Sequence, residues 1–263
     1  MIPSGAMRLS QAGTSDVGRK RTHNEDAYLL LPEESLFCVA DGMGGHASGE
    51  VAARIAVEEM AEFFRMTGRD EEATWPYKLD PARAYDENRL LTGVKLANLR
   101  IFERAASDQR LRGMGTTLVA ASFPRGGSRV MVGHVGDSRA YLLRGGEIRQ
   151  ITEDHSLLND YKKSRALTPE EIEAFPHKNV IVRALGMRDT VEVDVVREEL
   201  QAGDVLLLCS DGLSGMVPDA RIAEIVRGYP KDLRGAAQAL ADAANEAGGQ
   251  DNVTCVLVQH FAS

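Results

Sequence analysis

Short apolar runs, bounded by Gly, Asp or Pro, recur along the whole chain. They are rich in aliphatic and β-branched residues, a pattern typical of β-strands. It predicts strands at Ala27–Leu31, Leu36–Ala40, Thr117–Phe123, Arg129–Val135, Ala140–Arg144, Ile148–Thr152, Val191–Leu200, Val205–Cys209 and Asn252–Gln259. The Gly145-Gly146 pair between two of these runs predicts a hairpin turn.

Longer stretches place apolar residues at helical spacing between these runs. They predict helices at Gly49–Arg65, Asn88–Ala106, Asp219–Arg227 and Leu233–Ala247, with a long loop over Thr67–Pro81. The polar stretch Asp154–His177 predicts an exposed flap, with a short helix after Thr168-Pro169. Strands in consecutive runs with helices grouped between them favour an α+β sandwich of antiparallel sheets over a doubly wound fold. No linker or repeat divides the chain, so we expect one domain over residues 1–263.

Charge limits the classes of ligand that the protein can bind. The formal net charge is −8, which argues against a general binder of nucleic acid, because that affinity depends on Lys and Arg neutralising phosphates. A single phosphate needs only a local positive centre and is not excluded. An acidic protein that acts on a phosphorylated substrate needs something to offset the repulsion, and bound cations can do so.

Three cysteines, Cys38, Cys209 and Cys255, lie inside apolar runs. Their odd number and wide spacing argue against a disulfide framework or a zinc site and predict buried thiols in a reducing compartment. No apolar run is long enough to span a bilayer, and the first residues lack the pattern of a signal peptide. We therefore expect a cytoplasmic protein that does not bind membranes.

Aspartates recur at the edges of the predicted strands. Asp41, Asp137 and Asp211 follow apolar runs, and Asp251 precedes one. A single Asp-Gly step is a common turn former, so each one alone is also explained as a turn. Sheet packing can bring four strand ends together, where like charges repel unless cations lie between them. Oxygen ligands suit Mg²⁺ and Mn²⁺, and Gly42 would let its carbonyl approach a metal, so the pattern favours a hard-cation site.

The segment from Arg21 to Asp26 brings one cation and two adjacent carboxylates before a strand. Taken alone it is also explained as a charged surface loop. In a functional role, Arg21 would form a bidentate pair with a phosphoryl group. Glu25 and Asp26 would accept hydrogen bonds from metal-bound waters.

Six short motifs follow one another along the chain: Arg21-xx-Asn24-Glu25-Asp26, Val39-Ala40-Asp41-Gly42-Met43-Gly44-Gly45-His46, Gly113-Met114-Gly115-Thr116-Thr117, Gly133-His134-Val135-Gly136-Asp137-Ser138-Arg139, Ser210-Asp211-Gly212-Leu213 and Gln250-Asp251-Asn252-Val253-Thr254. In content and order they resemble the motifs of the metal-dependent protein phosphatases (the PPM family, type 2C), in their bacterial form. The resemblance runs from about residue 13 to residue 259. Six motifs in order are highly specific, whereas any one of them would be a weak signal.

The resemblance implies a four-layer αββα sandwich with a binuclear Mg²⁺ or Mn²⁺ centre at one end. It implies that Asp41 bridges the two ions, that Gly42 contributes its carbonyl to one, and that Asp211 and Asp251 bind the other. Asp137 with Asp211 matches a third metal site, and Arg21 matches the phosphate-binding arginine. The flap at Asp154–His177 falls where the family varies and would affect substrate choice and third-metal access.

The implied activity is hydrolysis of phosphoserine and phosphothreonine monoesters by direct attack of metal-activated water. No phosphoenzyme is required, in keeping with the lack of a CxxxxxR phosphate loop in the sequence. The implied partners are phosphorylated proteins, as substrates shared with Ser/Thr kinases, and we expect a monomer.

One position departs from the eukaryotic pattern, which often carries a histidine two residues after the bridging aspartate as a proposed general acid. Here that residue is Met43, as in the bacterial pattern. His46 or a metal-bound water is the alternative acid, and a purely structural role for His46 is also open. For His134 and His155 we expect structural roles.

Two other classes of function remain as alternatives at this point. A catalytically inactive binding module would have lost metal carboxylates, and all four are present. A different metal-dependent phosphohydrolase, such as a nuclease, is disfavoured by the acidic balance and the lack of basic stripes.

Overall fold

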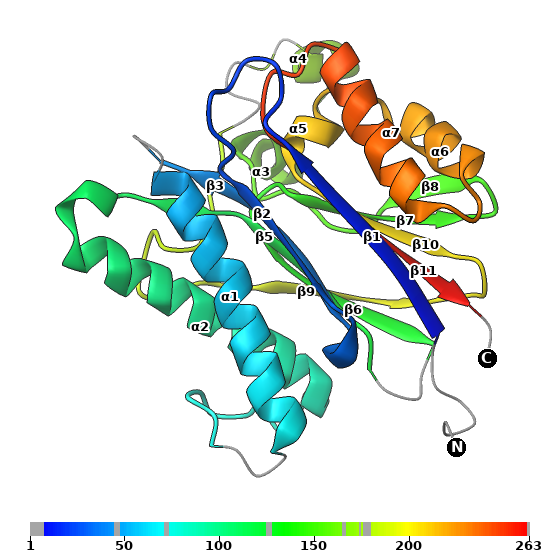
Figure 1. Cartoon of the computed structure of the whole chain (residues 1–263). Helices are drawn as coiled ribbons and strands as arrows, with labels where there is room; N and C mark the ends of the chain where they lie inside the picture. The colour runs from blue at the N-terminus through cyan, green and yellow to red at the C-terminus, as the bar shows by residue number, and fades with distance from the viewer. Residues whose placement is uncertain are drawn as a thin grey trace.

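The computed structural model describes residues 8–44, 48–70, 74–124, 128–164, 167–173, 175 and 180–261. Within these residues the strands form two antiparallel sheets that face each other (Figure 1). The first sheet has the order β1 (Arg8–Asp16), β11 (Val253–Phe261), β10 (Val205–Cys209), β7 (Arg139–Arg144) and β8 (Glu147–Gln150). The second has the order β2 (Asp26–Leu31), β3 (Leu36–Met43), β5 (Leu118–Ser122), β6 (Arg129–Val135) and β9 (Asp194–Glu199), with β4 (Gly115–Thr116) paired to β3.

Helices cover the outer face of each sheet. In Figure 1, α1 (Ser48–Arg69) and α2 (Tyr85–Ser107) pack on the second sheet, and α6 (Asp219–Gly228) and α7 (Leu233–Glu246) pack on the first. Shorter helices are η1 (Pro32–Glu34), η2 (Gln109–Leu111), α3 (Leu157–Ser164), α4 (Pro169–Glu173) and α5 (Asp211–Ser214). The expected four-layer αββα sandwich is therefore confirmed.

The central strands are buried on both faces, and their side chains divide between two cores. On β3, Phe37 and Val39 point into the core between the sheets, and Leu36, Cys38 and Ala40 point into the core under α1 and α2. This split follows from the two-residue period of a strand. It also explains why these strands appear in the sequence as unbroken apolar runs and not as alternating ones.

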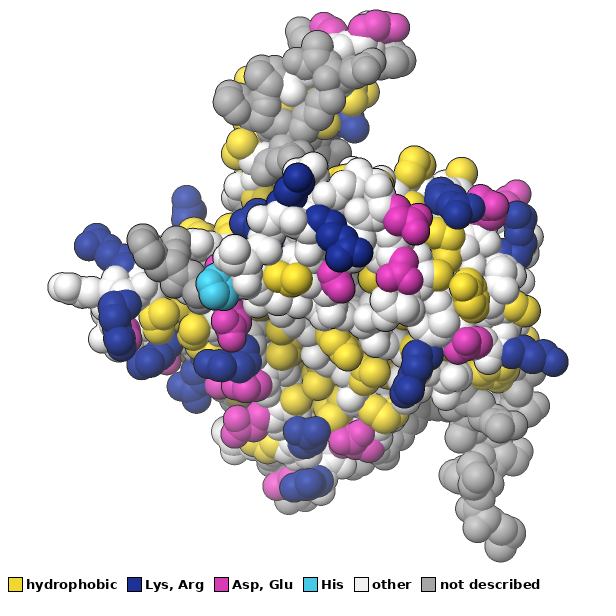
Figure 2. Space-filling model, turned by 45° about the horizontal axis from the view of Figure 1, so that its top comes forward, with side chains coloured by type: hydrophobic (Ala, Val, Ile, Leu, Met, Phe, Trp, Pro, Cys, Tyr) yellow, Lys and Arg dark blue, Asp and Glu magenta, His cyan; other side chains and the backbone are white. Residues whose placement is uncertain are grey.

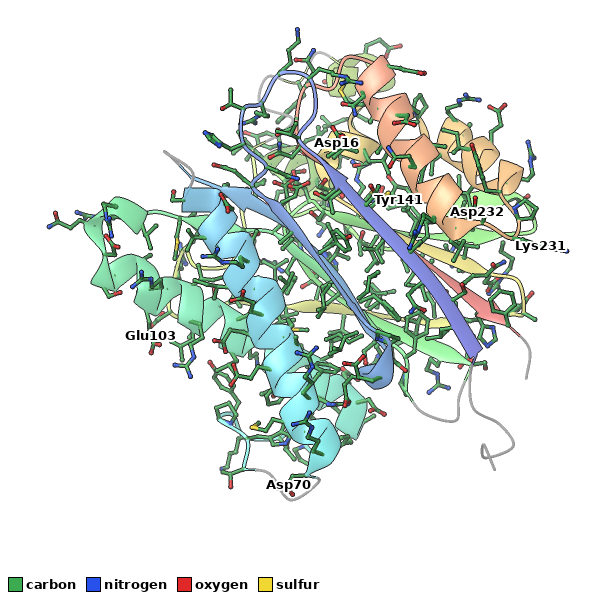
Figure 3. All side chains as sticks on the ribbon, in the orientation of Figure 1. Asp16, Asp70, Glu103, Tyr141, Lys231 and Asp232 are labelled. Atoms are coloured by element: carbon green, nitrogen blue, oxygen red, sulfur yellow. The ribbon has the colours of Figure 1, made fainter. Side chains whose placement is uncertain are left out.

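On the first sheet, β10 divides in the same way between the inter-sheet core and the core under α6 and α7. Tyr141 of β7 is fully buried in the latter and lies below α7 in Figure 3. All three cysteines are buried and unpaired, as expected.

Most element boundaries differ from the prediction by one to three residues. The strand predicted from Val191 begins at Asp194, α1 extends to Arg69 into the predicted loop, and the flap contains α3 in addition to the short helix α4. Strand β1 was not predicted, because its sequence RLSQAGTSD is mostly polar. It is an edge strand, and all nine of its residues pair with β11, so ladder hydrogen bonds compensate for the weak apolar pattern.

Among the described residues, none of the helices combines the length and the hydropathy that a membrane crossing requires.

Candidate metal centre

Four aspartates predicted as metal ligands come from both sheets and meet at one end of the sandwich. Asp41 lies near the end of β3 and Asp137 just after β6, both in the second sheet. Asp211 begins α5 directly after β10, and Asp251 precedes β11, both in the first sheet. The charges of Asp211, Asp137 and Asp251 all act on the Asp41 carboxyl, which places the four in one electrostatic cluster.

Asp26 belongs to the same cluster. It faces Asp41 across the β2–β3 ladder, and its Oδ2 accepts a hydrogen bond of 2.8 Å from Ser210 Oγ. Burial raises the pKa of Asp26 to about 7, although hydrogen bonds from Thr254 and Ser210 oppose the rise. Burial also raises the pKa of Asp41 well above its ordinary value, and the charge of Asp26 adds to this rise. Without a positive charge between them, these carboxyls resist ionisation.

Asp137 gives the most direct indication of a cation. It is 9% exposed, and its Oδ1 is buried without a hydrogen-bond partner among the residues that the structure describes. Burial raises the pKa of Asp137 to about 7, and Asp211 contributes further. Burial and the charge of Asp251 raise the pKa of Asp211, although a hydrogen bond with Asp41 lowers it. A divalent cation would supply both the missing partner and the missing charge, so this all-oxygen set fits Mg²⁺ or Mn²⁺.

Gly42 allows α1 to begin against the end of β3. Its amide donates to the Glu25 carbonyl oxygen at 3.1 Å. A Cβ atom at residue 42 would overlap the carbonyl oxygens of Glu25 and Gly49. Only glycine therefore permits this three-way backbone contact beside the carboxylates.

Arg21 reaches the cluster from the loop before β2. Its guanidinium donates to Asp251 Oδ2 at 2.7 Å, and its side chain is 52% exposed. Burial alone would lower the pKa of Arg21, but the charge and hydrogen bond of Asp251 raise it. Burial raises the pKa of neighbouring Glu25, with Arg21 opposing. Arg21 is thus a charged, partly exposed donor at the rim.

Asn252 holds this loop in place, a role that the sequence did not reveal. Its Oδ1 accepts from the Glu25 amide at 2.8 Å, and its Nδ2 donates to the carbonyls of Val17 and His23 at 2.9 Å. The residue lies in the sixth motif beside Asp251, so its position in the motif was the one available signal.

Asp16, labelled near this end in Figure 3, ties β1 to α7 by accepting a hydrogen bond from Asn245 Nδ2 at 3.0 Å.

The beginning of the flap is fixed to the first sheet by Arg139. Its guanidinium donates to both carboxylate oxygens of Asp154, at 2.7 to 3.1 Å. This bidentate pair lies two residues after Asp137 in sequence. The first turn of the flap is therefore anchored beside the carboxylate cluster.

Three histidines were considered in the sequence: His46, His134 and His155. His46, the candidate acid, lies outside the residues that the structure describes. His134 and His155 stack with ring centroids 4.7 Å apart, and both can approach Asp194 closely enough to suggest a second metal site. However, His155 Nδ1 accepts a hydrogen bond from the Gly136 amide, so its Nε2 carries the proton and donates to Asp194.

Arg183 adds a second argument against a metal at this histidine pair. Its guanidinium already lies 2.9 Å from Asp194 Oδ1 and supplies the positive charge there. Burial lowers the pKa of His134 to about 4, so that ring is neutral at pH 7. The contacts of His155 are consistent with a structural role, whereas His134 Nδ1 is buried without a hydrogen-bond partner among the described residues, and the role of His134 stays a prediction.

The known proteins that resemble this chain are phosphatases. The sequence model of the family described as Protein phosphatase 2C matches residues 12–257. The Serine/threonine phosphatase stp of Listeria innocua is 38% identical over 252 residues, covering 93% of each chain. The crystal structure of the Mycobacterium tuberculosis serine/threonine phosphatase PstP/Ppp aligns with a TM-score of 0.81 and 36% identity, covering 97% of this chain and 99% of the other.

A structure of the PstP catalytic domain in complex with two manganese ions aligns with a TM-score of 0.79 and 35% identity, covering 98% of this chain and all of the other. The chain belongs to the protein phosphatase 2C family, and the expected membership in a family of hydrolytic, metal-dependent phosphatases is confirmed.

Proposed function

We propose that this chain is a protein serine/threonine phosphatase that hydrolyses phosphoserine and phosphothreonine monoesters at the cluster of aspartates. The observation that carries the proposal is a cluster of buried and half-buried aspartates from both sheets, in which Asp137 Oδ1 is buried without a partner among the described atoms. The two manganese ions of the PstP domain support a centre of two divalent ions, Mg²⁺ or Mn²⁺.

Within this proposal, Asp41 would contribute to holding both ions, the Gly42 carbonyl would help to hold one, and Asp211 and Asp251 would help to hold the other. Asp137 and Asp211 form a third metal site, whose support is the buried free oxygen of Asp137. When bound, the ions would supply a water of lowered pKa as the nucleophile. Asp26 and Glu25 orient water around the ions by accepting hydrogen bonds.

Arg21 has the role of holding the phosphoryl group. In the described structure its guanidinium pairs with Asp251. A cation beside Asp251 would weaken that pair and release the planar fork to bind two phosphoryl oxygens. The proton for the leaving alkoxide comes from His46 or from water, since Met43 has no proton to donate.

The proposed activity belongs to the chain as a whole. One catalytic domain spans residues 1–263, and the flap at 154–177, anchored by Arg139 and Asp154, contributes to substrate choice. The enzyme acts in the cytoplasm as a monomer on phosphoproteins made by Ser/Thr kinases. Relatives named serine/threonine phosphatases support the substrate class.

Hydrolysis of an aryl phosphate, a phosphothreonine peptide and a phosphodiester, each with Mn²⁺ and with chelator, tests the function. We expect Mn²⁺-dependent release from the first two and none from the diester. A folded protein without metal-dependent release would instead be a binding module. Activity on the diester but not on the peptide would indicate a nuclease.

A further inference from the structure

A groove of about 1050 Å³ lies on the outer side of the second sheet, between the first half of α1 and η2. Four arginines line it: Arg54 from α1, Arg104 from α2, and Arg110 and Arg112 from η2 and the residue that follows it. In Figure 2, Lys and Arg side chains lie at the left, on the side where Figure 1 shows the end of α2, with hydrophobic and some acidic side chains between them.

The groove is positive although the chain as a whole is negative. Its lining contains four arginines against two carboxylates, Glu58 and Asp108, whereas the net charge of the protein is −8. Arg110 donates to both oxygens of Asp108, and these hydrogen bonds lower the pKa of Asp108 to about 2. Asp108 is therefore ionised and already paired, which leaves a local excess of positive charge.

The arginines of the two walls differ in how firmly they are engaged. Arg54 lies 4.0 Å from Glu58, at the limit of an ion pair, and both side chains are exposed. Arg112 is exposed and has no ion pair within the described part of the chain. Arg104 lies 3.9 Å from Asp108 and is also exposed, so Arg54, Arg104 and Arg112 are all available to an incoming anion. Between them, Val51, Ile55 and Leu111 provide a half-buried apolar floor.

Both walls of the groove start at the metal centre. Helix α1 begins against Gly42, because a Cβ on residue 42 would overlap the Gly49 carbonyl oxygen, and Val51 of the groove follows two residues later. The other wall, η2, leads into β4, which pairs Gly115 and Thr116 with Met43 and Gly42. Both walls are therefore joined along the chain to backbone that contacts Gly42, beside Asp41.

We propose that this groove binds an acidic segment of the phosphoprotein substrate, at a distance in sequence from the phosphorylated residue. The charge of the lining is complementary to Asp, Glu or further phosphorylated residues, and the apolar floor accepts a hydrophobic side chain between them. A segment bound in the groove raises the local concentration of the phosphoryl group at the metal centre, although the segment itself does not contact that centre. The inference rests on the proposed phosphatase activity, since it concerns the substrate of that site.

The test compares phosphothreonine peptides that differ only outside the phosphorylated residue. Two peptides carry a block of Glu, one at four to eight residues before the phosphothreonine and the other at four to eight residues after it. Two matched peptides carry Gln at the same positions. The variant Arg54→Glu/Arg112→Glu reverses one available charge on each wall of the groove. The control Arg221→Glu/Arg234→Glu makes the same change of charge on exposed residues of α6 and α7, over the other sheet.

For the native enzyme we expect kcat/KM about fivefold higher for one Glu peptide than for its Gln counterpart, with the preference decreasing as salt is added. Arg54→Glu/Arg112→Glu should remove this preference through KM, and leave aryl phosphate hydrolysis within twofold. The control variant should retain it. If the double variant does not fold, Arg112→Gln, which breaks no described ion pair, should halve the preference or more.

If kcat/KM is equal for Glu and Gln peptides, whether the block precedes or follows the phosphothreonine, the proposed substrate binding in the groove is refuted. The proposed phosphatase activity is not affected by that result. Retention of the preference in a folded Arg54→Glu/Arg112→Glu enzyme would refute it as well. Binding of a labelled oligonucleotide that depends on Arg54 and Arg112, with no effect on peptides, would assign the groove to nucleic acid. Absence of hydrolysis of every peptide by the folded, metal-loaded enzyme would overturn the proposed function itself.

Discussion

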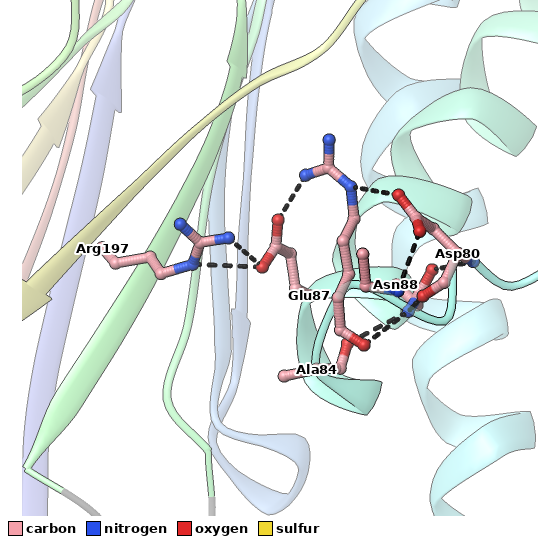
Figure 4. A network of polar contacts seen from close by, with 7 residues as sticks. Asp80, Ala84, Glu87, Asn88 and Arg197 are labelled. Carbon is pink, nitrogen blue, oxygen red and sulfur yellow. Dashed lines mark hydrogen bonds and ion pairs between the residues drawn. The ribbon is translucent and has the colours of Figure 1, made fainter.

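Two regions of the molecule bury carboxylates and treat them in opposite ways. On α2, Glu87 is 1% exposed and lies between Arg197 of β9 and Arg83 (Figure 4). Burial would raise the pKa of Glu87, but the hydrogen bonds from Arg197 and Arg83 lower it overall. At the metal end, Asp137 is 9% exposed, and burial raises its pKa to about 7 without an opposing arginine of equal effect.

The difference lies in where the arginines are placed. Asp204, also buried, receives a bidentate pair from Arg144, so the first sheet too compensates a buried carboxylate away from the metal end. Beside the aspartate cluster, Arg139 is engaged by Asp154 and Arg21 reaches only Asp251 at the rim. Paired carboxylates stabilise the fold, whereas an uncompensated cluster destabilises it until cations bind.

Replacement of Asp211 by Asn gives the largest expected effect on this comparison. Turnover with Mn²⁺ should fall at least about a hundredfold, because the neutral amide is a weak ligand for a hard cation. In the presence of chelator, the melting temperature should rise, because one of several repelling charges has been removed. Steady-state kinetics and thermal melts with and without Mn²⁺ measure both effects.

Asn at position 211 should also reduce the stabilisation by Mn²⁺, which for the native protein reaches about 2.7 kcal/mol when the metal is at a hundred times its dissociation constant. A folded Asp211→Asn enzyme with near-normal turnover would falsify the assignment of this residue to the metal centre. Asp242→Asn, an exposed aspartate on α7, is the control and should change neither quantity.

Arg21→Ala should have a smaller effect, on binding more than on turnover. Under the proposed phosphate-binding role, loss of this guanidinium should raise KM for a phosphothreonine peptide about tenfold, as expected for one charge-assisted hydrogen-bonding group. Arg21→Lys should recover only part of the lost substrate affinity, because the point charge of lysine does not make the bidentate contact. A KM equal to that of the native enzyme in both variants would remove the phosphate-binding role.

Elements of the fold could be predicted from the sequence where the local pattern of apolar and turn-forming residues was clear. The unbroken apolar run at Leu36–Ala40 predicted β3, and the Gly145-Gly146 pair predicted the β7–β8 hairpin. Strand β1 could not be predicted, because its pairing with β11 joins segments about 240 residues apart and its own pattern is polar. The four aspartates stood out because each borders a predicted strand.

Residues that act through distant partners were invisible in the sequence. Asn252 fixes the loop of Arg21 through three hydrogen bonds to backbone atoms more than 200 residues away. Glu87 and Arg197 are 110 residues apart, and nothing in either local sequence indicates the pair. Local pattern predicts which residues are charged or apolar, but the compensation of a buried charge depends on the completed packing.

Glu87→Gln sharpens the other half of the comparison and gives the smallest expected effect. The amide keeps the shape but loses charge-assisted hydrogen bonds, so the free energy of unfolding should fall by about 2 kcal/mol, or roughly 4–8 °C in melting temperature. Activity should be unchanged. Glu103→Gln, an exposed position on the same helix labelled in Figure 3, should shift the melting temperature by less than about 1 °C.

The pH dependence of this difference has a definite sign. The pKa of Glu87 is lower in the folded than in the unfolded protein, so the unfolded state binds the proton first as pH falls. The stabilisation by Glu87 is therefore complete above the unfolded pKa of about 4.3 and is lost as pH falls through the folded pKa. Melting curves of the native protein and Glu87→Gln should be separated at pH 7 and converge in acid. A separation that stays constant down to the acid limit would mean that packing, and not the charge of Glu87, stabilises this region.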